Sequence, residues 1–183
     1  MGHVAPYLPL ANSLREKGHE VAFVLRDLRM AETSLGQDDF PYFQAPVMLR
    51  KAENEIVTPY TFAQILHNVG YGNVQLLTGL AKGWRQIFNS YRPDLIIYDH
   101  SPTALLASRN MACKKVVIGN GFFIPPDVTP LPLLRNNPAP DIAVVAADET
   151  RILTNINQVL NRLGDTPVDR VAQLYDADDK ILL

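Results

Sequence analysis

Cysteine is almost absent from the sequence. Only Cys113 is present among 183 residues. One cysteine cannot form an internal disulfide, and it leaves no cysteine cluster to hold a structural metal ion. This usage is typical of proteins in the reducing cytosol, so we expect a cytoplasmic location.

Long apolar runs and an excess of one charge are also missing. No apolar run approaches the ~20 residues that a membrane-spanning helix needs. Arg15, Glu16 and Lys17 interrupt any signal-peptide-like apolar region at the start. The formal net charge is −2 with both signs mixed along the chain, which provides no surface for nucleic acid or an anionic membrane. At 47% hydrophobic residues the chain can bury one substantial core, so we predict a single domain.

The common catalytic and cofactor motifs are missing as well. No GxGxxG follows a strand and no GxxxxGK[ST] occurs, so nothing supports a nicotinamide-dinucleotide or P-loop site. The sequence has no GxSxG, no HExxH and no carboxylate cluster at metal-ligand spacing. We therefore predict neither a metal site nor a tightly bound cofactor.

What the sequence does contain is an alternation of helical and extended patterns. The run LIIY at Leu95–Tyr98 is continuously apolar, as in a parallel strand that is covered on both faces. The patterns predict strands at 21–25, 40–46, 95–99, 114–121 and 178–183, and helices at 4–17, 60–69, 74–91, 101–112, 148–164 and 167–175. This order predicts an α/β fold with a Rossmann-like, doubly wound parallel sheet.

Two segments are expected at the carboxyl edge of that sheet, where such folds bind ligands. Asp99 ends the strand LIIYD, and the loop GNGFFIPP follows the strand KKVVI. The proline-rich stretch Pro125–Pro140 is expected to be a loop on the same side, because regular structure resumes after it.

Four histidines are candidates for chemistry: His3, His19, His67 and His100. His19 follows the helix-ending Gly18 and is expected to fill a turn. His67, within a helical stretch, and His100, after a strand, could each have a structural or a pocket role. His3 directly precedes the first helical turn. With a carboxylate such as Asp99 behind it, this imidazole would have the arrangement of a general base; alternatively, Asp99 caps the next helix.

Two longer stretches resemble one family. GHVAPYLPLANSLREKGHEVAFV and, about a hundred residues later, PDLIIYDHSPTALLASRNMACKKVVIGNGFFIPP resemble the UDP-glycosyltransferase superfamily. The resemblance implies half of a GT-B fold, in which two Rossmann-like domains face each other across a cleft. In that family the N-terminal domain mostly holds the acceptor, and the C-terminal domain holds the nucleotide sugar.

The resemblance also implies roles for individual residues. His3 matches the base that deprotonates the acceptor hydroxyl, and Asp99 matches the carboxylate that orients this histidine. Phe122 and Phe123 match the region that lines the acceptor pocket, although either could be a plain core aromatic; His67 and His100 are further acceptor-binding candidates. The reaction inverts configuration without a bound metal or cofactor, and the UDP-sugar is a co-substrate.

The departures from the family pattern lead to a further expectation. Three parts of the family pattern have no counterpart in this sequence: the first strand with its glycine-containing run, the C-terminal domain, and the signature that binds UDP. We therefore expect residues 1–183 to be an incomplete acceptor-binding domain that is inactive alone and takes a small-molecule acceptor. Two alternatives stay open. One is the lipid-linked N-acetylglucosaminyl transferase of cell-wall synthesis, which has a glycine-rich loop in place of Asp99-His100-Ser101. The other is a non-catalytic acceptor-binding subunit of a split glycosyltransferase.

Overall fold

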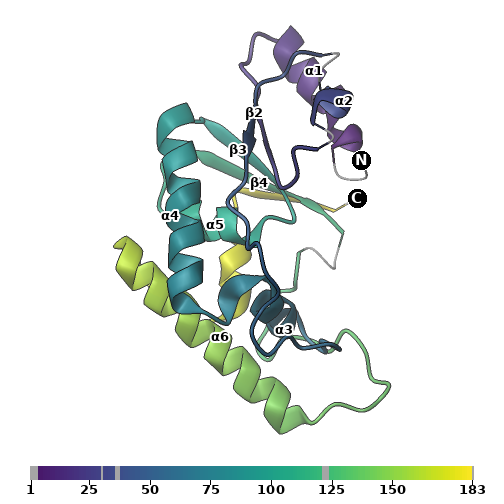
Figure 1. Ribbon diagram of the computed structural model, residues 1–183, viewed down its shortest axis with the longest axis vertical. Helices are drawn as coiled ribbons and strands as arrows, with labels where there is room; N and C mark the ends of the chain where they lie inside the picture. Colours follow the sequence, from purple (N-terminus) through teal and green to yellow (C-terminus); the bar gives the residue numbers. More distant parts are fainter. Residues whose placement is uncertain (1–3, 30, 36–37, 121–123, 183) are drawn as a thin grey trace. The chain divides into compact units, whose positions relative to one another are not determined.

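The chain forms two compact units, Met1–Val47 and Met48–Leu183. The structure is a computed structural model and describes residues 4–29, 31–35, 38–120 and 124–182. Each unit is an α/β arrangement with parallel strands, and Figure 1 shows the elements of both. The predicted fold class is confirmed.

The first unit pairs two short strands. Its elements are the 3₁₀ turn η1 (Ala5–Tyr7), α1 (Leu8–Glu16), β1 (Phe23–Leu25), α2 (Ala31–Leu35) and β2 (Tyr42–Gln44). The two strands are parallel, with Phe23 opposite Tyr42. Pro6 and Pro9 lie in the first turns, where the missing N–H costs little. Gly18 adopts φ 86° just beyond the end of α1, a conformation that favours glycine.

A small apolar cluster holds this unit together. Its buried members are Ala11, Leu25, Ala31, Leu35 and Phe40. The rings of Phe23 and Phe40 meet edge to face at 5.4 Å between centroids, and the Arg15 guanidinium lies 4.4 Å from the Phe40 ring centre. α1 and α2 are therefore tied to the strands by the same few side chains.

The second unit contains a three-stranded parallel sheet. Its elements are α3 (Phe62–Leu66), the π-type turn η2 (His67–Tyr71), α4 (Val74–Tyr91), β3 (Leu95–Asp99), α5 (Pro102–Ser108), β4 (Lys114–Gly119), α6 (Ile142–Leu163), the 3₁₀ turn η3 (Val171–Tyr175) and β5 (Asp179–Leu182). The strand order is β3-β4-β5, and every pairing is parallel.

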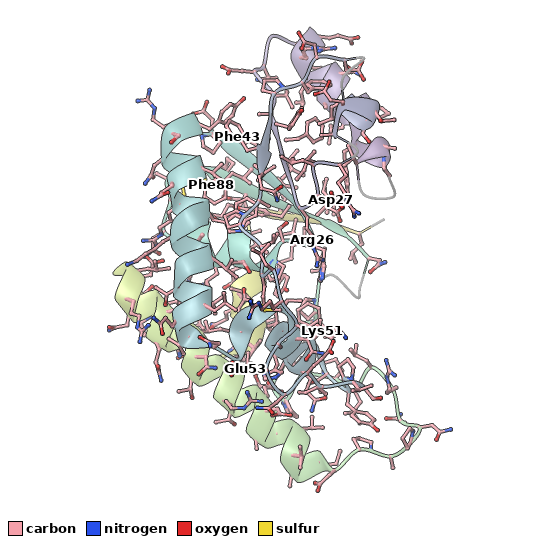
Figure 2. The ribbon with its side chains drawn as sticks, viewed as in Figure 1. Arg26, Asp27, Phe43, Lys51, Glu53 and Phe88 are labelled. Atoms are coloured by element: carbon pink, nitrogen blue, oxygen red, sulfur yellow. The ribbon has the colours of Figure 1, made fainter. Side chains whose placement is uncertain are left out.

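Helices and sheet share one core in this unit. α4 packs against both α5 and α6 (Figure 1). Phe88, labelled in Figure 2, stacks on Trp84 one turn earlier on α4, with ring centroids 5.5 Å apart. Tyr98 of β3 is buried, and its hydroxyl is 2.6 Å from the Ser108 hydroxyl, which links the strand to the end of α5.

Several boundaries differ from the sequence-based expectation. α6 begins at Ile142 rather than at Asp148, because the Asp141 carboxylate accepts hydrogen bonds from the amides of Ala143 and Val144 and caps the helix earlier. The predicted helix at 167–175 is reduced to η3, and α5 ends at Ser108. α2 was not predicted.

Arg85 connects three helices of the second unit. Its guanidinium donates to the Ala107 carbonyl at the end of α5 and to the Leu163 carbonyl at the end of α6, at 3.0 and 2.8 Å. It also donates to the Asp165 carboxylate at 2.6 Å. Asp165 is 4% exposed and Arg85 is 26% exposed, so this pair is largely removed from water.

We expect Arg85→Ala to lower the free energy of unfolding by about 3 kcal/mol, because it leaves the buried Asp165 carboxylate without its cation. Arg85→Lys keeps the charge, but an ammonium group cannot donate to the carboxylate and to both carbonyls at once. We therefore expect an intermediate loss of unfolding free energy. Urea denaturation of the three proteins measures the difference. A loss below about 0.5 kcal/mol for Arg85→Ala, as at an exposed ion pair, would contradict this role.

Candidate functional site

The pairing of β3 with β4 determines which residues meet at the carboxyl edge of the sheet. Asp99, the last residue of β3, lies opposite Ile118, and β4 ends one residue later at Gly119. His100 and Asn120 therefore begin the connections that leave the same edge. This is the edge at which parallel α/β sheets bind ligands, as the sequence predicted for Asp99.

The chain turns sharply directly after Asp99. His100 has φ 43°, the left-handed region that residues other than glycine adopt at a cost of roughly 1 kcal/mol or more. The Ser101 hydroxyl donates to the Asp99 carbonyl at 3.3 Å, and α5 starts at Pro102. Ser101 occupies the N-cap position of α5, but its side chain bonds to the strand end rather than to an α5 amide. The strained turn places the His100 imidazole at the edge of the sheet.

Phe62 provides an aromatic neighbour for His100. The Phe62 ring meets the His100 imidazole edge to face, with 6.1 Å between ring centres, and meets the Tyr175 ring in the same way at 5.4 Å. Phe62 is 3% exposed. No sequence pattern marks Phe62 and Tyr175, because residues so far apart in the chain are brought together only by the packing of α3 and η3 beside the strand end.

His67 has a different set of contacts. Its Nδ1 lies 3.1 Å from an Arg151 guanidinium nitrogen, and its Nε2 lies 3.1 Å from the Asn54 carbonyl oxygen. Since the guanidinium can only donate, Nδ1 accepts and Nε2–H donates to Asn54. The buried ring thus links the segment before α3 to α6. Its predicted contact with an acceptor remains a prediction.

The position of Gly72 confirms how tightly this ring is packed. A Cβ added at Gly72 would lie 2.4 Å from His67 Nδ1 and 2.6 Å from Cε1. The backbone at Gly72 has φ −69°, which any residue can adopt, so space alone requires glycine here. The ring could make room only by leaving Arg151.

We expect Gly72→Ala to lower the free energy of unfolding by roughly 1–3 kcal/mol, the usual cost of overpacking. Gly79→Ala is the matched control. Gly79 lies within α4 with open space around it, and alanine there should stabilise the helix by about 1 kcal/mol. Chemical denaturation of both variants provides the comparison, and a neutral Gly72→Ala would show that His67 is not held in this position.

In the part of the loop after β4 that the structure describes, three contacts anchor it to other segments of the second unit. The buried Glu149 carboxylate accepts from the Leu131 amide at 2.9 Å. Arg170 donates two hydrogen bonds to Asp127, and these hydrogen bonds hold the pKa of the Asp127 carboxyl below its usual value. The Leu134 amide donates to the Tyr60 carbonyl at 2.8 Å, which joins this loop to the segment before α3.

Glu149→Ala should loosen this loop, since the buried Leu131 amide loses its acceptor. Arg135, exposed in the loop, is a convenient trypsin site. We expect faster cleavage after Arg135 in Glu149→Ala than in the unchanged chain, and near-normal cleavage in Glu149→Gln, whose amide oxygen still accepts. Equal cleavage rates in the alanine and glutamine variants would argue against the anchor.

The other predicted site residues cannot be placed. His3, Phe122 and Phe123 lie outside the described residues, so the structure shows no distance between His3 and Asp99. Of the residues it does describe, it brings His100 against Phe62 and directs His67 to Asn54 and Arg151.

The described part of the chain was also searched for a metal site, a membrane-spanning helix and surface hollows. No group of three or more His, Cys, Asp or Glu side chains there is arranged to hold a metal ion, and no helix there is long and apolar enough to cross a membrane. Two open hollows, of about 520 and 320 Å³, have linings that include neither Asp99 nor His100. The larger is lined by Thr154, Asn157, Gln158, Asn161 and Arg162, and the smaller by Arg109, Asn110, Lys115, Asp176, Ala177 and Asp178.

Comparison with known proteins identifies a related fold. No family model matches the sequence, and no curated protein matches it. Among solved structures, the chain is similar to the glycosyltransferase SsfS6 of Streptomyces sp. SF2575, which was solved in complex with thymidine diphosphate. The TM-score is 0.50 at 18% identity, and the match covers 92% of this chain and 44% of that one. The chain thus spans less than half of that structure, and the likeness shows a Rossmann-like part of a glycosyltransferase fold.

Proposed function

We propose that this chain is the acceptor-binding half of an inverting glycosyltransferase, which moves a sugar from a UDP-sugar to a hydroxyl of a small or lipophilic acceptor. The observation that carries the proposal is the fold likeness to a glycosyltransferase over 92% of the chain. The arrangement at the carboxyl edge supports it: a carboxylate, Asp99, ends β3, and the next residue, His100, is set in a strained turn against Phe62.

The donor in this proposal is a nucleoside diphosphate sugar that is bound mainly outside these 183 residues. The similar structure carries thymidine diphosphate, a pyrimidine nucleoside diphosphate of the same chemical class as UDP, and this chain corresponds to 44% of its length. The donor is a co-substrate rather than a cofactor, and the isolated chain is expected to be inactive.

The proposed chemistry is a single displacement. The His3 imidazole removes the proton of the acceptor hydroxyl while the oxygen attacks the anomeric carbon, and the nucleoside diphosphate leaves from the opposite face with the electron pair of the broken bond. Asp99 orients His3 and stabilises the imidazolium that forms. His67, His100, Phe122 and Phe123 are proposed to line the acceptor site.

Replacement of His3 tests the base directly. In the enzyme that combines this chain with its donor-binding half, His3→Ala should lower kcat by roughly 10²–10⁴, with a much smaller effect on acceptor binding. His19→Ala is the matched control, because His19 follows the end of α1 and has no proposed role. Turnover of a hydroxyl acceptor by His3→Ala at the rate of the control would eliminate His3 as the base.

Asp99→Asn should also lower kcat, because an amide can favour the wrong imidazole tautomer, and its effect should be strongly non-additive with that of His3→Ala. The comparison needs kcat for the two single variants and the double variant. If Asp99 serves only the turn into α5, Asp99→Asn will cost a few tenths of a kcal/mol in stability and leave turnover unchanged. The alternative function, a non-catalytic acceptor-binding subunit, makes a different prediction. In that case this chain, combined with its donor-binding half, would bind the acceptor but would transfer no sugar to it.

A further inference from the structure

The first two turns of α6 carry apolar side chains that are open to solvent. Ile142 is 60% exposed and Val144 is 53% exposed. Ala143, Ala146 and Ala147 are exposed as well, so that in residues 142–147 only one side chain is buried. This segment is the green, lower end of α6 in Figure 1.

The rest of α6 has the ordinary amphipathic pattern. Ile152, Ile156 and Leu160 are completely buried, whereas the exposed positions between and after them include the polar Thr154 and Asn161. A helix that is apolar on all sides normally packs against other elements on all sides. The start of α6 therefore has the composition of a buried segment and the exposure of a surface one.

The loop that leads into α6 enlarges this apolar surface. The Glu149 carboxylate holds the Leu131 amide beside α6, at 2.9 Å. Leu133 and Leu134, two and three residues beyond that anchor, are 36% and 39% exposed. Exposed apolar side chains that occur together, rather than singly, are typical of a surface that binds a partner. We name Leu133, Leu134, Ile142, Val144 and the three alanines the α6-start surface.

One exposed cation and one exposed anion lie within the same stretch of chain. Arg135 follows Leu134, and Asp141 directly precedes Ile142. The two formal charges cancel, so the α6-start surface has no net attraction for an anionic membrane. A second copy of the chain is complementary to it, because the copy offers an Asp141 to Arg135 and an Arg135 to Asp141.

We propose that the α6-start surface is an interface between two copies of this chain that are related by a two-fold axis. Every contact in such an interface occurs twice, so Arg135 of each copy lies against Asp141 of the other while the apolar side chains cover each other. The alanines allow the two helices to approach closely. The surface is small, so the dimer is weak and forms as the protein concentration rises. The interface is independent of the proposed glycosyl transfer.

Val144→Glu tests the interface without weakening α6. Val144 is the third residue of the helix, where a glutamate stabilises the helix start, so the variant is expected to fold normally. The new charge lies within the proposed interface and should raise the dimer dissociation constant about tenfold or more. Thr154→Glu is the matched control, because it adds the same charge to an exposed position of α6 outside the surface, and it should change the constant less than about twofold.

Sedimentation velocity over a concentration series of the 183-residue chain measures these constants. A chain that stays monomeric up to about 1 mM would overturn the proposal. Dimerisation of Val144→Glu with the same constant as Thr154→Glu would also overturn it. Binding of a monomeric chain to phosphatidylcholine vesicles, lost in Val144→Glu, would show that a lipid surface covers these residues instead.

The charge arrangement is tested separately. Arg135→Glu sets two carboxylates against each other at each end of the interface and should raise the dimer dissociation constant about tenfold. Adding Asp141→Asn removes this repulsion while the asparagine still caps α6, so the double variant should dimerise more tightly than Arg135→Glu alone. An Arg135→Glu chain that dimerises like the unchanged chain would contradict the two-fold arrangement.

Discussion

The in-register parallel pairing of β3 with β4 is the constraint on which the candidate site depends. Parallel strands need a crossover that returns the chain to the starting edge, and here α5 provides it. Buried Tyr98 and Val117 lie opposite each other in this pairing, and the Tyr98–Ser108 hydrogen bond ties the strand to the end of the crossover helix. With that register set, Asp99 has to lie where the chain leaves the sheet, and the left-handed turn at His100 follows.

α6 is the element that holds the surroundings of this edge in place. Its side chains reach two other segments of the second unit. Glu149 bonds to the loop after β4, while Arg151 bonds to His67 and Asn155 to the Tyr71 carbonyl, at 2.8 Å, at the two ends of η2. The bond from Glu149 satisfies a backbone amide in the irregular loop after β4, and the other two bonds fix η2 against α6. The loops near the candidate site are therefore positioned by polar contacts from one long helix, rather than by apolar packing alone.

The sequence predicted the strands and helix ends that local residue patterns determine. Continuous apolar runs predicted β3 and β4, and the helix-ending Gly18 correctly marked the end of α1. The start of α6 was missed because the Asp141 cap stands before an apolar run without clear helical spacing, and α2 was missed because five residues carry little periodicity. The contact of Phe62 with His100 and Tyr175, and the bonds of His67, could not be predicted, since they arise only when distant segments pack together.

Acceptor binding at the carboxyl edge is the central claim, and an NMR titration of the isotopically labelled 183-residue chain with 2-naphthol, a small phenolic acceptor, tests it most directly. The account predicts saturable shift changes that concentrate on His3, His100 and Phe62 and leave His19 unmoved. Shift changes confined to the hollow along α6 at Asn157 and Asn161, or no saturable change at all, would contradict it.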